Sequence, residues 1–141
     1  MREGWPRVTV VVPVHNGAAM IGTCLEALVG LDYPAQALEI VVVDNRSTDD
    51  TRAIVRARPV RLVEETRVQS SYAARNRGVL VSQGDVVAFT DADCVPDRQW
   101  LRALVAPLAN PQVGGVAGGI EPYQARTLVE RYQARRALRA W

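Results

Sequence analysis

Three separated runs of β-branched and other apolar residues constrain the fold of this chain more than any other feature of its sequence. They lie at residues 7–14 (RVTVVVPV), 38–43 (LEIVVV) and 86–90 (VVAFT). Each run is apolar at almost every position, which is typical of a strand that is covered on both faces. These runs therefore predict the buried strands of a parallel sheet.

Helical patterns separate the predicted strands. Between residues 17 and 31 apolar side chains recur every three or four positions, and we expect Asn16 to cap this helix. The run STDD at residues 47–50 has the composition of a capping box, which predicts a short helix to about residue 58. Strands that alternate with helices favour an open α/β sheet with helices on both faces. Weaker patterns predict further strands at 60–63 and 113–120 and helices at 70–81 and 98–108.

Length and composition bound the functions that the chain can have. Its 141 residues are the size of one domain, and a hydrophobic content of 48% with 23% charged residues is typical of a globular protein. The net charge of +2 comes from balanced acids and bases, so charge gives no support to nucleic-acid binding. All 17 basic residues are arginine. A sequence without lysine excludes a P-loop lysine, a lysine Schiff base and an ammonium general base.

The two cysteines, Cys24 and Cys94, lie far apart in the sequence. With one histidine and no CxxC pair, the usual zinc-ligand spacings are absent, and we expect two reduced thiols rather than a disulfide. No apolar run approaches the ~18 residues of a membrane span, and the N-terminal MREGWPR lacks the apolar core of a signal peptide. These features predict a cytoplasmic protein without a transmembrane segment.

Polar residues follow three of the predicted strands at the point where each strand ends. They are the clusters His15-Asn16, Asp44-Asn45 and Asp91-Ala92-Asp93. In a parallel α/β sheet, the loops at the carboxyl ends of the strands form the binding crevice. We therefore expect these three clusters, distant in the sequence, to face one cleft.

The acidic residues of these clusters indicate the chemistry of the cleft. Asp91 and Asp93 are two residues apart, so a turn between them can bring both carboxylates to one point. Mg²⁺ or Mn²⁺ is commonly held by one or two carboxylates together with phosphate oxygens. Asp44 can accept hydrogen bonds from a base or a ribose. For each aspartate alone, capping of the following loop is the ordinary alternative, but the pairing favours a site for a metal and a phosphorylated ligand.

Other α/β classes with acidic strand ends fit the sequence less well. Residues 91–95 (DADCV) satisfy the Asp-x-Asp-x-Thr/Val motif of haloacid-dehalogenase-like phosphatases, but in that family the motif ends the first core strand and a later lysine supports the phosphate. Response-regulator receiver domains also need a lysine and an acidic pair after strand one. Gly17 and Gly22 do not form a GxGxxG motif, and no GxxxxGK occurs. Nucleotidyltransferases of related fold and an unrelated α/β binding domain stay open at this point.

Four segments together resemble the family 2 glycosyltransferases with the GT-A fold. They are VTVVVPVHN (8–16), VVVDNRSTDDT (41–51), SSYAARNRGV (70–79) and VVAFTDADCV (86–95), followed by Pro96 and Trp100-Leu101. Their order and spacing over residues 7–120 carry the resemblance. It implies a GT-A (Rossmann-like) open, mainly parallel sheet and inverting transfer. It also implies a nucleotide-diphosphate sugar donor (UDP-sugar by default), Mn²⁺ or Mg²⁺, and a carbohydrate or lipid-linked acceptor in polysaccharide biosynthesis.

The resemblance also implies roles for individual residues. Asp93 would be the direct metal ligand, and Asp91 would lie nearer the ribose or a metal-bound water. The implied donor-contacting residues are Pro13, His15, Asn16, Asp44, Arg75, Asn76 and Asp91, the implied metal ligands are Asp93 and Asp91, and Ser47, Asp49 and Thr51 match the loop and cap after Asp44. Since there is no lysine, Arg75 is the best candidate for positive charge at the phosphates, with solvation or pairing to Asp44 as its alternatives.

The sequence departs from the family pattern at two positions, and no residue in it has a good case as the general base. Arg46 stands where the family often has glycine, and Cys94 stands where an acid is common. In the family, the general base comes from a second half of the catalytic domain. The acids that follow Asp93 here are Asp97, Glu121 and Glu130, and none has a good case as that base.

We therefore expect the chain to be a truncated part of such an enzyme. Residues 1–124 would form an incomplete GT-A nucleotide-sugar-binding domain, and residues 125–141 an amphipathic helix that leads toward missing structure or mediates self-association. The alternative is a non-catalytic nucleotide-sugar-binding module, or a half-site completed by a partner chain. The arginines of the last helix are compatible with a peripheral place at the inner face of a membrane, although such residues usually form a solvated face.

Overall fold

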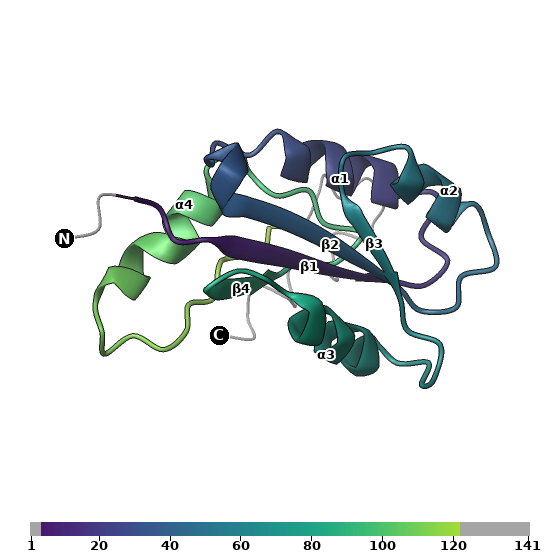
Figure 1. The fold of residues 1–141 in the computed structure, drawn as a ribbon. Coiled ribbons are helices and arrows are strands. Elements are labelled where there is room, and N and C mark those ends of the chain that lie inside the picture. The colour runs from purple at the N-terminus through teal and green to yellow at the C-terminus, as the bar shows by residue number, and fades with distance from the viewer. Residues whose placement is uncertain (1–3, 122–141) are drawn as a thin grey trace.

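The computed structural model describes residues 4–121, which form one open parallel sheet with helices on both faces (Figure 1). The strand order is β3-β2-β1-β4, and every neighbouring pair is parallel. This arrangement confirms the predicted α/β class. In chain order the elements are β1 (Val8–Val14), α1 (Ile21–Val29), η1 (Ala35–Ala37), β2 (Leu38–Asp44), α2 (Thr51–Arg56), β3 (Arg61–Glu64), α3 (Ser71–Val81), β4 (Val86–Phe89), α4 (Trp100–Val105) and η2 (Ala106–Ala109).

The strand β1 lies in the centre of the sheet, which explains why every one of its residues is buried. It pairs with β2 along its whole length but with β4 only as far as Val11. Val11 O accepts a hydrogen bond from Thr90 N on the β4 side, whereas Val14 O accepts one from Asn45 N on the β2 side. The backbone groups of successive residues in a strand point to alternate sides, so Pro13, like Val11, faces the β4 side. It lies beyond the last residue that pairs with β4, so the missing N–H of proline leaves no strand partner unsatisfied.

Helices cover both faces of the sheet, with α1, α2 and α4 on one face and α3 on the other (Figure 1). One face carries the larger core, in which side chains of α1, α2 and α4 pack on the even-numbered valines of β1. The other face is covered by α3, whose Ala74 packs with Val11, Val41 and Val43. A Cβ at Gly78 would clash with the Val11 side chain, so this glycine permits the close approach of α3 to β1.

Several predicted boundaries are wrong. The first helix begins at Ile21 without a side-chain cap, and Asn16 instead has a positive φ of 48°. The expected capping box is also absent, because the N-cap Asp50 of α2 makes no side-chain cap bond. In contrast, α3 has a side-chain cap, since the hydroxyl of its N-cap Ser70 accepts a hydrogen bond from Ala73 N. The helix predicted at 98–108 divides into α4 and the 3-10 turn η2, which contains Pro107.

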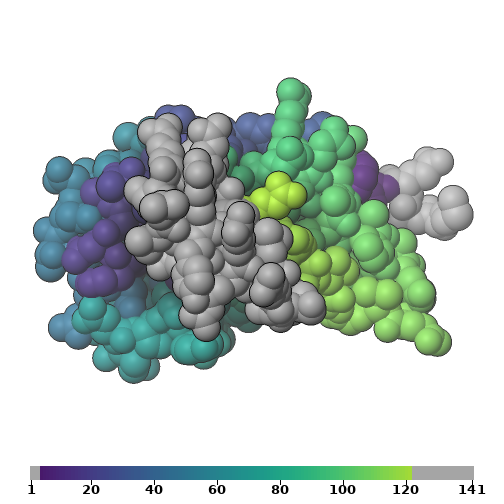
Figure 2. Space-filling view, turned by 180° about the vertical axis from the view of Figure 1, so that it is seen from behind, coloured from purple at the N-terminus to yellow at the C-terminus, as the bar shows by residue number. Residues whose placement is uncertain are grey.

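The fifth strand predicted at residues 113–120 does not form in the described part of the chain. This stretch contains four glycines, whose large backbone entropy opposes a strand, and most of its residues are exposed. It lies beside α4, with Gly118 close to the side chains of Trp100 and Leu104 (Figure 2, yellow-green). The helix expected over 125–141 falls outside the described residues. Among the helices of residues 4–121, none has the length and apolar character needed to cross a membrane.

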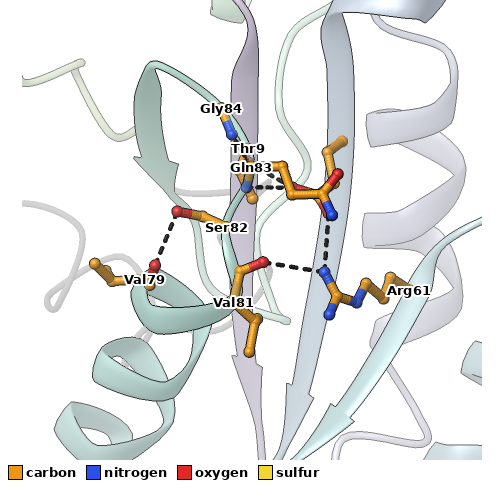
Figure 3. A network of polar contacts seen from close by, with 8 residues as sticks. Thr9, Arg61, Val79, Val81, Ser82, Gln83 and Gly84 are labelled. Atoms are coloured by element: carbon orange, nitrogen blue, oxygen red, sulfur yellow. Dashed lines mark hydrogen bonds and ion pairs between the residues drawn. The ribbon is translucent and has the colours of Figure 1, made fainter.

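A polar network anchors the turn between α3 and β4 to the amino-terminal edge of the sheet (Figure 3). The Glu39 carboxylate accepts hydrogen bonds from Thr9 Oγ1 at 2.6 Å, Gln83 N at 3.0 Å and Arg61 Nη1 at 3.2 Å. Arg61 also donates to Val81 O, and Thr9 Oγ1 accepts from Gly84 N. Burial alone would raise the pKa of Glu39, but the bonds from Thr9, Gln83 and Arg61 outweigh it and lower that pKa.

We expect Glu39→Gln to lower the free energy of unfolding by about 1 kcal/mol at pH 7, because the substitution removes charge-assisted hydrogen bonds. Since the folded-state pKa is lowered from 4.5, this stabilisation is fully present above the unfolded pKa and is lost as pH falls through the folded value. Urea unfolding of both proteins at pH values between about 7 and about 3 spans the ordinary glutamate pKa of about 4.3. The difference between their free energies of unfolding should therefore become smaller as the pH falls.

The control for this prediction is Glu26→Gln. Glu26 forms a single ion pair with Arg58, and its side chain is 73% exposed, against 24% for Glu39. An exposed pair of this kind contributes at most about 0.5 kcal/mol. Equal effects of the two substitutions at every pH would contradict the role assigned to the Glu39 network.

Candidate functional site

The loops that follow β1 and β2 are joined at the carboxyl edge of the sheet. His15 Nδ1 donates to Asn45 O at 2.8 Å, and Asn16 N donates to Ser47 Oγ at 2.9 Å. Because Asn45 O can only accept, Nδ1 carries the proton of this bond, and Gln69 Nε2 lies 3.1 Å from Nε2. Both ring nitrogens of His15 are therefore engaged in holding loops together.

Asn16 forms the second link between these loops. Its Oδ1 accepts hydrogen bonds from Thr48 N at 2.7 Å and from Thr48 Oγ1 at 3.3 Å. Its backbone has φ of 48°, a left-handed conformation that asparagine tolerates better than most residues. Asn16 therefore positions a loop, where the sequence pattern had predicted a helix cap.

The loop before α2 is closed by Asp49 and Thr51. Thr51 Oγ1 accepts from Gly17 N at 2.9 Å and donates to Asp49 Oδ1, while Asp49 Oδ2 accepts from Ala18 N at 3.1 Å. The hydrogen bonds to the Asp49 carboxylate lower the pKa of Asp49 and keep it ionised, and the bond from the Thr51 hydroxyl is the largest cause. The residues predicted to form this loop therefore bind the β1 loop as well as their own helix.

Asp44 is the most unusual member of the site because it is buried and only half satisfied. The residue is 1% exposed, and its Oδ2 accepts a hydrogen bond from Ser47 N at 3.2 Å. Its Oδ1 is buried and has no hydrogen-bond partner within residues 4–121. A buried carboxylate oxygen without a partner is costly, so this atom calls for an explanation such as a water, an ion or a ligand group.

The third cluster is a turn after β4 that gathers potential metal ligands. Cys94 N donates to Asp91 O at 3.0 Å, which closes the turn. Ligand atoms of Asp91, Asp93 and Cys94 all lie within 4.8 Å of one another. Two carboxylates and a thiol in this arrangement can hold a divalent ion, so the donor set fits the predicted metal site.

The turn is fixed to its neighbours by Arg75 and Cys24. Arg75 Nη2 donates to Asp91 Oδ1 at 2.6 Å, whereas the sequence had left open a partnership with Asp44. Cys24 in α1 is buried, and its Sγ lies 3.5 Å from Asp91 O, to which the thiol donates. Burial, and then the charges of Cys94, Asp93 and Asp91, raise the pKa of Cys24 to about 12, so it stays a neutral thiol.

Asn76, also predicted to contact the donor, is placed differently from Arg75. It lines an open cavity of about 520 Å³ between β3, the following loop and α3. The other lining residues include Glu65, Arg67 and Arg77, and none of them belongs to the turn at Asp91. Arg75 is therefore brought to the acidic turn, and Asn76 is not.

Sequence reasoning missed the residues that connect the site to the loop after β3. Asn45 Nδ2 donates to Glu65 O and Val68 O, both at 2.9 Å, and Gln69 reaches His15. Asn45 had been noted only as a polar strand end. Gln69 lies in a segment without a periodic pattern, so nothing local in the sequence marked it.

Comparison with known proteins gives a consistent result. The family model described as "Glycosyl transferase family 2" matches residues 9–139. Glycosyltransferase AglE of Haloferax volcanii is 39% identical over 141 residues, which cover 95% of this chain and 46% of the relative. Probable glycosyltransferase YdaM of Bacillus subtilis is 34% identical over 137 residues, which cover 90% of this chain and 33% of the relative.

Two solved structures show the same arrangement of the backbone. Mannosyltransferase PcManGT from Pyrobaculum calidifontis, in complex with GDP-Man and Mn²⁺, has a TM-score of 0.78 at 41% identity, over 83% of this chain and 36% of that one. Glucosyl-3-phosphoglycerate synthase from Mycobacterium tuberculosis, in complex with Mn²⁺, UDP and phosphoglyceric acid, has a TM-score of 0.65 at 27% identity, over 74% of this chain and 39% of that one. The chain thus spans less than half the length of each of these four proteins.

We expect Asn16→Ala to lower the free energy of unfolding by about 2 kcal/mol. It removes the Thr48 bonds, about 1 kcal/mol, and places a Cβ-bearing residue without a local hydrogen bond in the left-handed region, roughly another 1 kcal/mol. Asn16→Gly should cost only about 1 kcal/mol, because glycine adopts this conformation freely. Asn16→Asp keeps the acceptor and serves as the control. Urea denaturation that ranks alanine no worse than glycine would contradict this assignment.

Proposed function

Because the chain belongs to glycosyl transferase family 2, we propose that the loops at the carboxyl ends of its strands bind the nucleoside diphosphate of a sugar nucleotide together with a divalent ion. Membership confirms the resemblance identified in the sequence, and the parallel sheet confirms the expected GT-A fold. The proposed reaction is inverting transfer of the sugar to a carbohydrate or lipid-linked acceptor. The described residues would supply the donor half of that site.

The observation that carries this proposal is the unpartnered, buried Oδ1 of Asp44. At the end of β2 this oxygen can accept hydrogen bonds from a nucleobase N–H or a ribose hydroxyl. A bound nucleoside would thereby remove the energetic cost of leaving the carboxylate oxygen unsatisfied. The loops held by His15 and Asn16 lie beside it and would form the wall of the nucleoside site.

Asp91 and Asp93 would hold the divalent ion. Both side chains are exposed on the turn after β4, and their ligand atoms already lie close together. When bound there, a divalent ion supplies positive charge that stabilises the diphosphate as it leaves the sugar. In this role the chain's own residues orient the diphosphate, and Asp93, which has no salt bridge among the described residues, is the more available ligand.

Arg75 would act beside the acidic turn. Its guanidinium holds Asp91 Oδ1 and keeps further N–H groups that can donate to phosphate oxygens. It thus fixes the orientation of Asp91 and adds positive charge, which matters in a sequence that has no lysine. Asp97, by contrast, accepts a hydrogen bond from Gln99 N in the turn before α4, whose N-cap residue is Gln99 and not Asp97.

The identity of the nucleotide is proposed as a uridine or guanosine diphosphate. The sequence resemblance favours UDP by default, the M. tuberculosis synthase structure contains UDP, and the P. calidifontis mannosyltransferase structure contains GDP-Man. Both of those structures also contain Mn²⁺, which supports Mn²⁺ as the first ion to test, with Mg²⁺ beside it.

Calorimetric titration of UDP and of GDP into the purified chain, with and without Mn²⁺, tests the site as a whole. We expect binding of at least one nucleotide that is roughly tenfold or more tighter with Mn²⁺, and loss of that enhancement in Asp93→Asn. Asp97→Asn is the matched control, because the asparagine oxygen keeps the bond to Gln99 N. An intact fold that binds neither nucleotide, with or without the ion, would overturn the proposal.

A second measurement separates binding from stability at Asp44. Asp44→Asn keeps an oxygen for Ser47 N and removes a buried charge, so the free energy of unfolding should change by less than about 1 kcal/mol. Nucleotide affinity should fall roughly tenfold or more, since charge-assisted bonds to the nucleoside are lost. Asp50→Asn, an exposed acid in the same loop without a cap bond, should change neither quantity. Unchanged affinity in Asp44→Asn would remove Asp44 from the donor site.

A further inference from the structure

We propose that Cys94 supplies a sulfur ligand to the divalent ion held by Asp91 and Asp93, and that this ligand makes the site favour thiophilic ions such as Co²⁺, Zn²⁺ and Cd²⁺ over Mg²⁺. The inference rests on the proposed function, because it takes the metal site to lie at the turn after β4. It adds a residue that determines which ion the site selects.

The geometry of the turn places the thiol among the carboxylates. The hydrogen bond from Cys94 N to Asp91 O folds residues 91–94 back on themselves, so that both side chains and that of Asp93 share one side. Cys94 Sγ lies 3.8 Å from Asp93 Oδ1, and the thiol donates toward it. Two ligands at about 2.1 Å and 2.3 Å from one ion are about 3.6 Å apart in tetrahedral geometry. The ligand atoms of this cluster lie within 4.8 Å of one another, so side-chain rotation would bring them to one ion.

The existing contacts of Asp91 limit the oxygen ligands that it can offer to an ion. Asp91 Oδ1 already accepts the hydrogen bond from Arg75, which leaves Oδ2 as its less engaged oxygen. A site formed by the carboxylates alone would therefore offer few protein oxygens. Cys94 is the remaining ligand-bearing residue of the cluster, and its thiol proton would leave to solvent when the sulfur binds the ion.

The preference follows from the chemistry of the donor atoms. Mg²⁺ demands a near-octahedral shell of oxygens and gains little from sulfur, whereas Co²⁺, Zn²⁺ and Cd²⁺ bind thiolate strongly. Mn²⁺ lies between these groups, since it accepts oxygen ligands and tolerates softer ones. A thiolate at this position would therefore give a larger difference in affinity between these ions than two carboxylates alone would give.

Cys24 provides an internal control. It is buried in α1, and its thiol donates to the backbone carbonyl of Asp91 instead of lying in the ligand cluster. The two cysteines thus differ in the property that the proposal requires, although both are near the same turn. A signal that depends on Cys94 and survives replacement of Cys24 identifies the ligand.

The experiment is titration of the reduced 141-residue chain with Co²⁺, followed by near-ultraviolet absorption. A thiolate-to-cobalt charge-transfer band is expected in the unchanged chain and in Cys24→Ser, whose hydroxyl can still donate to Asp91 O, and it should be absent in Cys94→Ser and Cys94→Ala. Calorimetry should show Co²⁺ and Cd²⁺ affinity falling roughly tenfold or more in Cys94→Ser, with Mg²⁺ affinity changed less than about twofold. Far-ultraviolet circular dichroism verifies that each variant is folded.

The outcomes distinguish this inference from the function on which it rests. If the unchanged chain shows no charge-transfer band but still binds Mn²⁺ and nucleotide in an Asp93-dependent way, Cys94 is not a ligand and the donor site stands. A band that persists in Cys94→Ser and disappears in Cys24→Ser likewise overturns the assignment. If no divalent ion binds, in the presence or absence of nucleotide, the metal site itself is wrong and both proposals fall.

Discussion

The burial of β1 on both faces is the constraint on which the rest of the structure depends. Its side chains alternate between two cores, one formed with α1, α2 and α4 and the other with α3. A strand buried in this way must pair on both edges, and β2 and β4 supply those pairs in parallel. Because all four strands are parallel, their carboxyl ends meet along one edge. The polar residues that follow these strands are brought together there by the same packing that forms the core.

The features that the sequence predicted correctly are those set by long, strongly apolar patterns. The runs that became β1 and β2 are largely buried, whereas β4, expected to be covered on both faces, is an edge strand of the described sheet and its Phe89 is 45% exposed. The order of the three runs along the chain determines which loops share an edge. Predictions from short polar motifs, such as helix caps, were less reliable. Asn16 has the composition of a helix cap, yet it bonds Thr48 on another loop, a contact between residues 32 positions apart. The VGGVAGGI stretch has strand-like residues, but its glycines and exposure leave it irregular. A tertiary partner decided the first case and cannot be read from a short segment, whereas the glycines decided the second.

The candidate site also concentrates the local features that a stable fold would otherwise avoid. Asn16 and Arg46 are the non-glycine residues with positive φ among residues 4–121, and they lie in the loops after β1 and β2. Asp44, two residues before Arg46, carries one of the two buried side-chain atoms without a hydrogen-bond partner among the described residues; the other, Arg102 Nε, lies in α4. Strained backbone and unsatisfied polar atoms cost of order 1–3 kcal/mol each, and they persist where the surrounding structure holds them for a purpose. Their joint location therefore supports a binding role independently of the family match.

The charges at this edge explain why an ion and a nucleotide would bind together. Asp44, Asp91 and Asp93 face the site, and Arg75 already neutralises one of them. A diphosphate that approached these carboxylates without an ion would meet like charge, which Arg75 offsets only in part. In the proposed site, a divalent ion at the acidic turn would reverse the sign of the charge that the diphosphate meets, and the diphosphate would supply oxygen ligands that two aspartates do not. Each ligand would therefore raise the affinity for the other, and by linkage the coupling would be the same in both directions. The acidic turn would thus attract an anion only when the cation is present.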